Sequence, residues 1–200
     1  MSHRLVYVIG PSGAGKDSVL HALRKIWPAP ASALRAHWAP RTITREAQAR
    51  GEQHETVLPA TFNTLRAQNA FGLHWQANGL LYGIRTSELL GPLESGCCVF
   101  VNGSRGHLPT VLYQWPEATV VHISAPPQLL AQRLATRGRE APKDILARLH
   151  REVALNLPGN HIEICNDGPL EKAANELAKR LDQRLGTAAQ KRPRFTSEVR

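Results

Sequence analysis

The stretch RLVYVIGPSGAGKDSVL, residues 4–20, decides the fold of this chain. Residues 4–9 form a short apolar run rich in β-branched side chains, which predicts a strand buried in a parallel sheet. Residues 10–16 match the pattern GxxxxGK and lead into apolar residues at helical spacing. A glycine-rich turn between a strand and a helix gathers backbone N–H groups around a phosphate, and the lysine adds a positive charge. We therefore predict a nucleotide phosphate loop rather than a plain strand–helix turn with an exposed lysine.

The loop and the start of its helix supply the predicted ATP-binding residues, and Lys16 among them is predicted to be catalytic. They are Gly10, Pro11, Ser12, Gly13, Ala14, Gly15, Lys16, Asp17 and Ser18. The usual motif has Ser or Thr after the lysine as a ligand for Mg²⁺, whereas this chain has Asp17 followed by Ser18. Two interpretations stay open. Either Asp17 ligates Mg²⁺, because a carboxylate suits a hard cation, or Ser18 does and Asp17 favours the helix N-terminus.

The rest of the chain alternates predicted strands and helices. Apolar runs at 97–101, 118–123 and 161–165 predict further strands, and helical patterns follow the second and third of these runs. Such alternation is typical of βαβ units and a parallel sheet. Residues 35–84 differ, because they hold short extended pieces, a weak helix at 59–69 and a hairpin signal at Asn78-Gly79. We predict a three-layer α/β fold with a small antiparallel insertion.

The composition of the chain indicates the cellular compartment in which the protein is active. The 200 residues are 42% hydrophobic and 20% charged, which suits a globular domain. The three cysteines are an odd number without CxxC spacing, so they are predicted to be reduced structural thiols in the cytoplasm. The apolar runs are too short for a membrane span or a secretory signal. We predict a cytoplasmic protein without a membrane partner.

The formal net charge of +9 points to an anionic partner, either a nucleic acid or a phosphorylated small molecule. Part of the charge lies in residues 187–200, which lack periodicity and are predicted to be a basic, disordered tail. The chain has no RNA-recognition signature, zinc-finger spacing or basic stripe interleaved with aromatic residues. We therefore predict a small-molecule substrate and no nucleic acid, because the net charge is the sole feature of the sequence that favours a nucleic-acid partner.

Further motifs resemble the guanylate-kinase family of P-loop kinases along residues 4–185. They are RTITR (41–45), NGLLYG (78–83), APP (125–127), RLATRGR (133–139), ARL (147–149) and ND (166–167). One branch, the ribose 1,5-bisphosphate phosphokinases of phosphonate catabolism, is similar in more detail. Its motifs are GPSGAGKDS (10–18), ITR (43–45), Glu52 with His54, WQANGLLYG (75–83), VNGSR (101–105) and NDG (166–168).

The resemblance implies transfer of phosphate from ATP, with Mg²⁺, to ribose 1,5-bisphosphate, giving 5-phosphoribosyl 1-diphosphate. It also implies a kinase domain over residues 1–186, with a core at about 1–34 and 85–186, an acceptor-binding insertion at about 35–84 and a lid at about 133–150. Arg137 and Arg148 match lid arginines that close over ATP, so both are predicted to be catalytic. Arg133 and Arg139 are equally well explained as charges on a helix surface.

The predicted acceptor-binding residues are Arg41, Arg45, Glu52, His54, Tyr82, Asn102, Ser104 and Arg105. Guanidinium groups suit bidentate capture of phosphate, and polar residues after a buried strand lie where ligands bind in open sheets. Simpler explanations stay open for some of them. The arginines at 41 and 45 could be solvated surface charges, Glu52 and His54 a structural pair, and Tyr82 a half-buried hairpin residue.

The main alternative is a guanylate kinase or another nucleoside-monophosphate kinase. Guanylate kinases read guanine with acidic and hydroxyl side chains at the positions that match His74, Ile84 and Asn102 here. Polar groups of guanine left unpaired cost ~1–3 kcal/mol each, so we expect GMP to be a poor acceptor. A protein-interaction module is a second alternative, but such modules typically lack the phosphate loop. The oligomeric state stays open, with a homodimer as one option.

Overall fold

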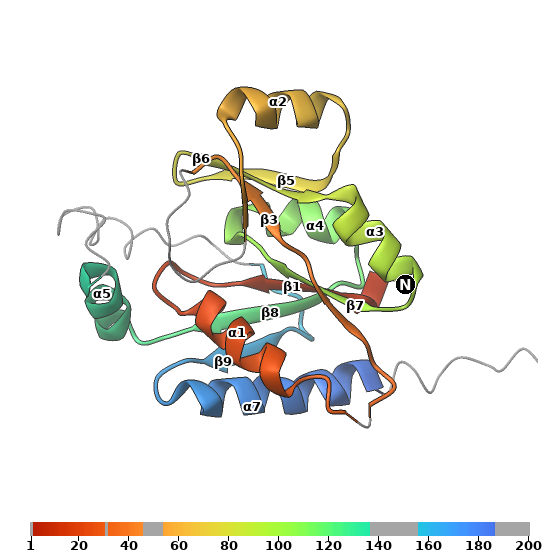
Figure 1. Ribbon diagram of the computed structural model, residues 1–200. Helices are drawn as coiled ribbons and strands as arrows, with labels where there is room; N and C mark the ends of the chain where they lie inside the picture. The colour runs from red at the N-terminus through yellow and green to blue at the C-terminus, as the bar shows by residue number, and fades with distance from the viewer. Residues whose placement is uncertain (1, 31, 46–53, 137–155, 187–200) are drawn as a thin grey trace, which may run out of the picture.

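A five-stranded sheet forms the centre of the computed structural model, which describes residues 2–30, 32–45, 54–136 and 156–186 (Figure 1). Its order is β2-β7-β1-β8-β9, and every neighbouring pair is parallel. The strands are β1 (Leu5–Ile9), β2 (Ala36–Trp38), β7 (Cys98–Asn102), β8 (Thr119–Ser124) and β9 (Ile162–Cys165). The predicted α/β class and parallel sheet are confirmed.

Helices cover both faces of this core sheet. They are α1 (Lys16–Ile26), α3 (Thr86–Glu94), α4 (Leu108–Gln114), α5 (Pro127–Thr136) and α7 (Leu170–Leu181), with 3₁₀ turns at Ser2–Arg4 and Arg105–His107 and a π-helical turn at Asp182–Gly186. Helix α2 (Pro59–Ala67) lies on the insertion instead, where its Phe62 ring stacks on Phe71 (Figure 1). Figure 1 shows α1 and α7 below the sheet and α3 and α4 above it. None of the helices in the described ranges is long and apolar enough to cross a membrane.

Strand β1 joins the two halves of the core because all of its residues are buried and successive side chains point to opposite faces. Val6 and Val8 pack in a cluster with α1 and α7. Tyr7 and Ile9 pack in a second cluster, which also contains Trp75 from the insertion. The insertion is therefore seated on the core sheet by shared apolar side chains.

The insertion forms a second sheet with the order β4-β3-β6-β5. Its strands are β3 (Arg41–Ile43), β4 (His54–Thr56), β5 (Phe71–Ala77) and β6 (Leu80–Arg85). The predicted hairpin is confirmed, since β5 and β6 pair antiparallel around Asn78 and Gly79, whose φ angles are 51° and 74°. The predicted purely antiparallel sheet is wrong in one pairing, because β4 runs parallel to β3.

Three elements carry weak sequence signals. Strand β2 lies in the part of the chain grouped with the insertion, yet it pairs with β7 at the edge of the core sheet. It has only three residues, too few for a periodic pattern. Helix α3 contains Pro92, which argues against a helix interior, and α4 has seven residues. Most of the lid predicted at about 133–150 and the tail predicted at 187–200 lie outside the described residues.

Candidate active site

The phosphate loop joins β1 to α1 at the carboxyl end of the core sheet, as predicted. Gly15 caps α1 with a φ of 79°, and a Cβ at this position would lie 2.5 Å from Nδ2 of Asn166. Both observations require glycine. The Lys16 ammonium donates hydrogen bonds to the carbonyl oxygens of Gly10 (2.9 Å) and Pro11 (3.2 Å), so the side chain folds back across the loop.

Asn166 holds the loop from the end of β9. Its side chain is buried, and its Nδ2 donates a 2.8 Å hydrogen bond to the carbonyl oxygen of Ala14. This residue was noted in the ND motif but was not among the predicted site residues. Its position directly after a predicted strand could have identified it, because polar residues at the carboxyl ends of parallel strands lie at the edge of the sheet where ligands bind.

Two cavities flank the loop, and Gly13 and Gly15 line both of them. We call the first the insertion-side cavity. Its volume is about 480 Å³, and it is lined by Gly10, Ser12, Gly13, Gly15, Lys16, Asp17, Arg41, Arg45, Trp75, Ala77, Asn78, Leu80, Tyr82, Asn102, Gly103, Ser104 and Leu134. We call the second the α5-side cavity. Its volume is about 600 Å³, and it is lined by Gly13, Gly15, Ser18, Leu129, Gln132, Arg133, Thr136, Asn166, Gly168 and Leu170.

The insertion-side cavity gathers residues that the sequence places far apart. Arg41, Arg45 and Tyr82 come from the insertion, whereas Asn102 and Ser104 follow β7 of the core sheet. All five are predicted acceptor-binding residues. Trp75 and the hairpin tip at Asn78 were not predicted, because nothing local in a hairpin indicates which of its faces meets the core.

Asp17 lies on the insertion side of the loop. Its Oδ1 is 3.3 Å from Nη2 of Arg41 and also accepts a hydrogen bond from Nδ2 of Asn102. A second nitrogen of Arg41 donates to the Asn102 carbonyl oxygen at 3.4 Å. Ser18, the neighbouring residue, lines the opposite cavity. The two candidate ligands for Mg²⁺ therefore face different sides of the loop.

Some predicted residues lie elsewhere. Arg105 is half-buried, which lowers the pKa of its guanidinium, and it is not among the residues that line the cavity. His54 on β4 does not line it either. Ile84 is fully buried in the core and His74 is exposed on β5, so of the three positions compared with guanylate kinases only Asn102 lines the cavity. Glu52, Arg137 and Arg148 lie outside the described residues.

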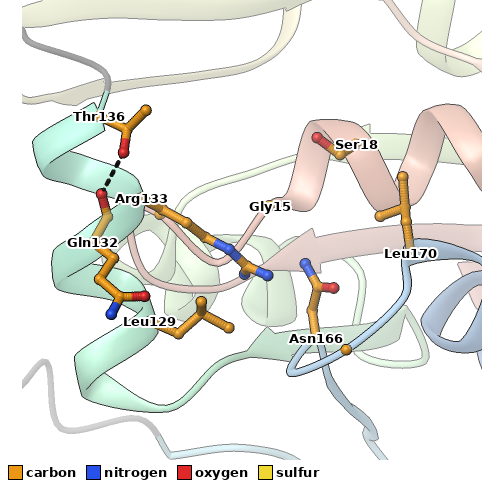
Figure 2. A pocket seen from close by; sticks show the side chains of 10 residues that line it. Gly15, Ser18, Leu129, Gln132, Arg133, Thr136, Asn166 and Leu170 are labelled. Carbon is orange, nitrogen blue, oxygen red and sulfur yellow. Dashed lines mark hydrogen bonds between the residues drawn. The ribbon is translucent and has the colours of Figure 1, made fainter.

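Arg133 dominates the α5-side cavity (Figure 2). Its side chain extends from α5 toward Gly15 and Asn166. A Cβ on Gly15 would lie 3.9 Å from Nη1 of Arg133, and this buried nitrogen has no hydrogen-bond partner within the described residues. The structure therefore favours a role in the site over a charge on a helix surface. The helical pattern of α5 alone could not distinguish the two.

Comparisons with known proteins show the family to which the chain belongs. No family model matches the chain. The chain is 42% identical over 179 residues to "Ribose 1,5-bisphosphate phosphokinase PhnN" of Pseudomonas paraeruginosa, covering 88% of this chain and 94% of that protein. It is 40% identical over 186 residues to the protein of the same name from Azotobacter vinelandii, covering 92% and 98%. The chain belongs to the ribose 1,5-bisphosphate phosphokinase family.

A solved structure shares the fold of this chain. The chain superimposes on guanylate kinase from Anaplasma phagocytophilum with a TM-score of 0.64 at 14% identity, covering 94% of this chain and 86% of that one. At this identity the likeness shows the fold alone, and it confirms the predicted guanylate-kinase-like architecture. As kinases, the ribose 1,5-bisphosphate phosphokinases use ATP.

Proposed function

We propose that this protein transfers the γ-phosphoryl group of ATP to ribose 1,5-bisphosphate, giving ADP and 5-phosphoribosyl 1-diphosphate. One observation supports the proposal above all: the phosphate loop lies between two cavities and contributes Gly13 and Gly15 to both. A phosphoryl transfer between two bound substrates needs a phosphate site open to both, because the attacking oxygen must reach the γ-phosphorus directly, to within about 3–3.5 Å.

The α5-side cavity is proposed to bind ATP. Its volume of about 600 Å³ lies within the range of small-molecule sites. Leu129 and Leu170 offer apolar surface to a nucleobase, and the Arg133 guanidinium supplies positive charge beside the phosphate loop. Residues 10–18 are proposed to hold the phosphates through backbone N–H groups and the N-terminal end of α1.

The insertion-side cavity is proposed to bind the doubly phosphorylated sugar. Arg41 and Arg45 provide guanidinium groups for its phosphates, and both reach the same cavity as Lys16. Asn102, Ser104 and the Tyr82 hydroxyl are proposed to contact the sugar or its phosphates. Two arginines and one lysine against the single carboxylate of Asp17 leave the described lining cationic, as a bisphosphate requires.

The reaction needs no general base. The second pKa of a phosphate monoester is near ~6, so at neutral pH the 1-phosphate oxygen is already ionised and can attack the γ-phosphorus. A new O–P bond forms, the bond between the γ-phosphorus and the β,γ-bridging oxygen breaks, and ADP leaves. Lys16 is proposed to stabilise the charge on the transferring group.

The proposal also includes a Mg²⁺ ion bound with ATP. Among the described residues no cluster of three or more His, Cys, Asp or Glu side chains could hold a metal ion. Mg²⁺ in kinases commonly takes one or two protein oxygens and completes its shell with phosphate oxygens and water, so Asp17 or Ser18 fits this requirement. When bound, the ion neutralises charge on the β- and γ-phosphates.

The division into core, insertion and lid, with Arg137 and Arg148 closing over ATP, stays part of this proposal, because residues 137–155 are outside the described ranges. Glu52, His54 and Arg105 likewise stay proposed acceptor contacts. The three cysteines are free thiols, and we place the reaction in the cytoplasm, where thiols stay reduced.

A coupled assay of ADP release with two acceptors tests the proposal. We expect turnover with ribose 1,5-bisphosphate and a kcat/KM for GMP lower by at least about two orders of magnitude, because the described cavity lining has no carboxylate other than Asp17 to receive the guanine edge. The product should be identified as a 1-diphosphate by ³¹P NMR. Comparable values for GMP would support a nucleoside-monophosphate kinase instead and overturn the proposal.

A further inference from the structure

Three rings and a guanidinium lie in series where the insertion meets the core. The ring centroids of His107 and Trp75 are 5.5 Å apart with planes inclined by 22°. The rings of Trp75 and Tyr82 are also 5.5 Å apart and nearly parallel, at 3°. Arg41 Cζ lies 5.7 Å from the centroid of the Tyr82 ring. We call the three rings the junction stack.

The members of the junction stack come from different layers. Trp75 and Tyr82 are directly opposite each other on β5 and β6, so their contact is a cross-strand pair within the insertion. His107 ends the 3₁₀ turn after β7 and belongs to the core. It is therefore one of the points at which the core meets the insertion's aromatic side chains.

His107 is itself held by the core through Tyr7. The Tyr7 hydroxyl lies 3.4 Å from Nδ1 of His107 and accepts a 3.0 Å hydrogen bond from the Ser104 N–H. The Tyr7 ring is fully buried and packs so closely under Gly103 that a Cβ there would overlap it. Tyr7 thus fixes the 103–104 turn, which lines the insertion-side cavity, and the His107 ring together.

Both polar members of this contact are uncharged at neutral pH. Burial, and then the nearby His74, lowers the pKa of His107, and burial raises the pKa of Tyr7 above its ordinary value. A neutral imidazole can pack face to face with an indole without placing a second positive charge near Arg41. The junction stack is therefore suited to set a position rather than to exchange protons.

Trp75, Tyr82 and Arg41 line the insertion-side cavity, whereas His107 lies behind them. We propose that His107 is a positioning residue for the acceptor: its ring, fixed by the core, sets Trp75 and through it Tyr82 and Arg41 at the cavity wall. The inference rests on the proposed function in taking the acceptor to be a sugar phosphate. It assigns His107 no contact with either substrate.

Three variants test the inference by steady-state kinetics. His107→Ala removes the ring, His107→Phe keeps a flat ring, and Tyr113→Ala removes an aromatic ring that is 89% exposed on α4, outside the junction stack. We expect His107→Ala to raise the KM for ribose 1,5-bisphosphate about tenfold and to change the KM for ATP less than about twofold. His107→Phe should recover most of the loss, and Tyr113→Ala should match the wild type. Equal increases in both KM values, no increase, or a Phe variant as impaired as the Ala variant would overturn the inference.

A binding measurement separates this inference from the proposed reaction. Calorimetry with ribose 5-phosphate as the probe measures sugar-phosphate affinity without turnover, and near-UV circular dichroism reports the packing of the junction stack. We expect weaker probe binding and an altered aromatic spectrum in His107→Ala, with both restored in His107→Phe. If wild-type protein binds the probe but does not phosphorylate the bisphosphate, the proposed function fails alone. If probe affinity is the same in wild type and His107→Ala, the positioning role fails.

Discussion

The two cavities that share the phosphate loop differ in the side chains around them. The α5-side cavity offers Leu129 and Leu170 together with one cation, Arg133. The insertion-side cavity gathers Lys16 and two arginines around one carboxylate. A nucleoside triphosphate has a large apolar base and one cluster of charge, whereas a sugar bisphosphate has charge at both ends and little apolar surface. The difference in lining therefore supports the proposal that the donor binds on one side of the loop and the acceptor on the other.

One feature is common to both sides. Arg133 Nη1 and Arg45 Nε are buried nitrogens with no hydrogen-bond partner within the described residues. A buried unsatisfied donor costs free energy, and more so when it belongs to a charged group, so such groups are typical of sites that receive an anion. Each cavity thus has an arginine of this kind, and what the two cavities share is the phosphate loop at Gly13 and Gly15.

The largest effect should follow from removing the cation of the phosphate loop, Lys16, which lines the insertion-side cavity. Lys16→Ala is expected to lower kcat by roughly 10²–10³-fold, because the charge that stabilises the transferring phosphoryl group is lost. The thermal unfolding midpoint should stay close to that of the wild type, since the hydrogen bonds of Lys16 to the Gly10 and Pro11 carbonyl oxygens lie within the loop itself. A folded variant with near wild-type turnover would contradict the kinase mechanism for both cavities.

Arg45→Ala and Arg133→Ala should separate the cavities. Loss of one charge-assisted contact is worth ~1.5–3 kcal/mol, which corresponds to roughly a ten- to hundredfold change in kcat/KM. We expect Arg45→Ala to affect chiefly the value for the acceptor and Arg133→Ala chiefly the value for ATP. The measurement is kcat/KM for each substrate at saturating levels of the other. The same profile in both variants would mean that the two sides do not divide the substrates.

A smaller effect is expected at Asp17, which faces the acceptor side but occupies the motif position of a metal ligand. Asp17→Asn keeps the size of the side chain and removes its charge. If Asp17 holds Mg²⁺, the Mg²⁺ concentration for half-maximal rate should rise about tenfold, and excess metal should restore the rate. An unchanged Mg²⁺ requirement would assign the ion to Ser18 and leave Asp17 as a partner of Arg41 and Asn102.

Local signals explain what the sequence could predict. The phosphate loop and the hairpin turn at 78–79 are each encoded by a few consecutive residues that adopt specific backbone conformations, and both form as expected. The parallel pairing of β3 with β4 has no such signal, because two three-residue strands carry no register information. The hydrogen bond between Asn166 and Ala14 has no local sequence signal either, because the two residues are 152 positions apart in the chain.

The candidate site shows the same limit. Sequence motifs located Arg41, Arg45, Tyr82, Asn102 and Ser104, and the structure brings them to one cavity. The sequence explains Arg133 equally well as a charge on a helix surface, because helical periodicity does not indicate what faces the polar side of a helix. His107 carries no motif of its own, and its place beside Trp75 depends on how the insertion packs on the core.

Simultaneous binding of the two substrates tests the central claim most directly. Calorimetry can titrate ribose 1,5-bisphosphate into the protein alone and into protein saturated with a non-hydrolysable ATP analogue and Mg²⁺. Two cavities on opposite sides of one loop predict a single acceptor site in both titrations, with affinity retained or improved when the analogue is bound. Loss of acceptor binding in the presence of the analogue would mean that both ligands compete for one cavity, and the account of donor and acceptor sides would be wrong.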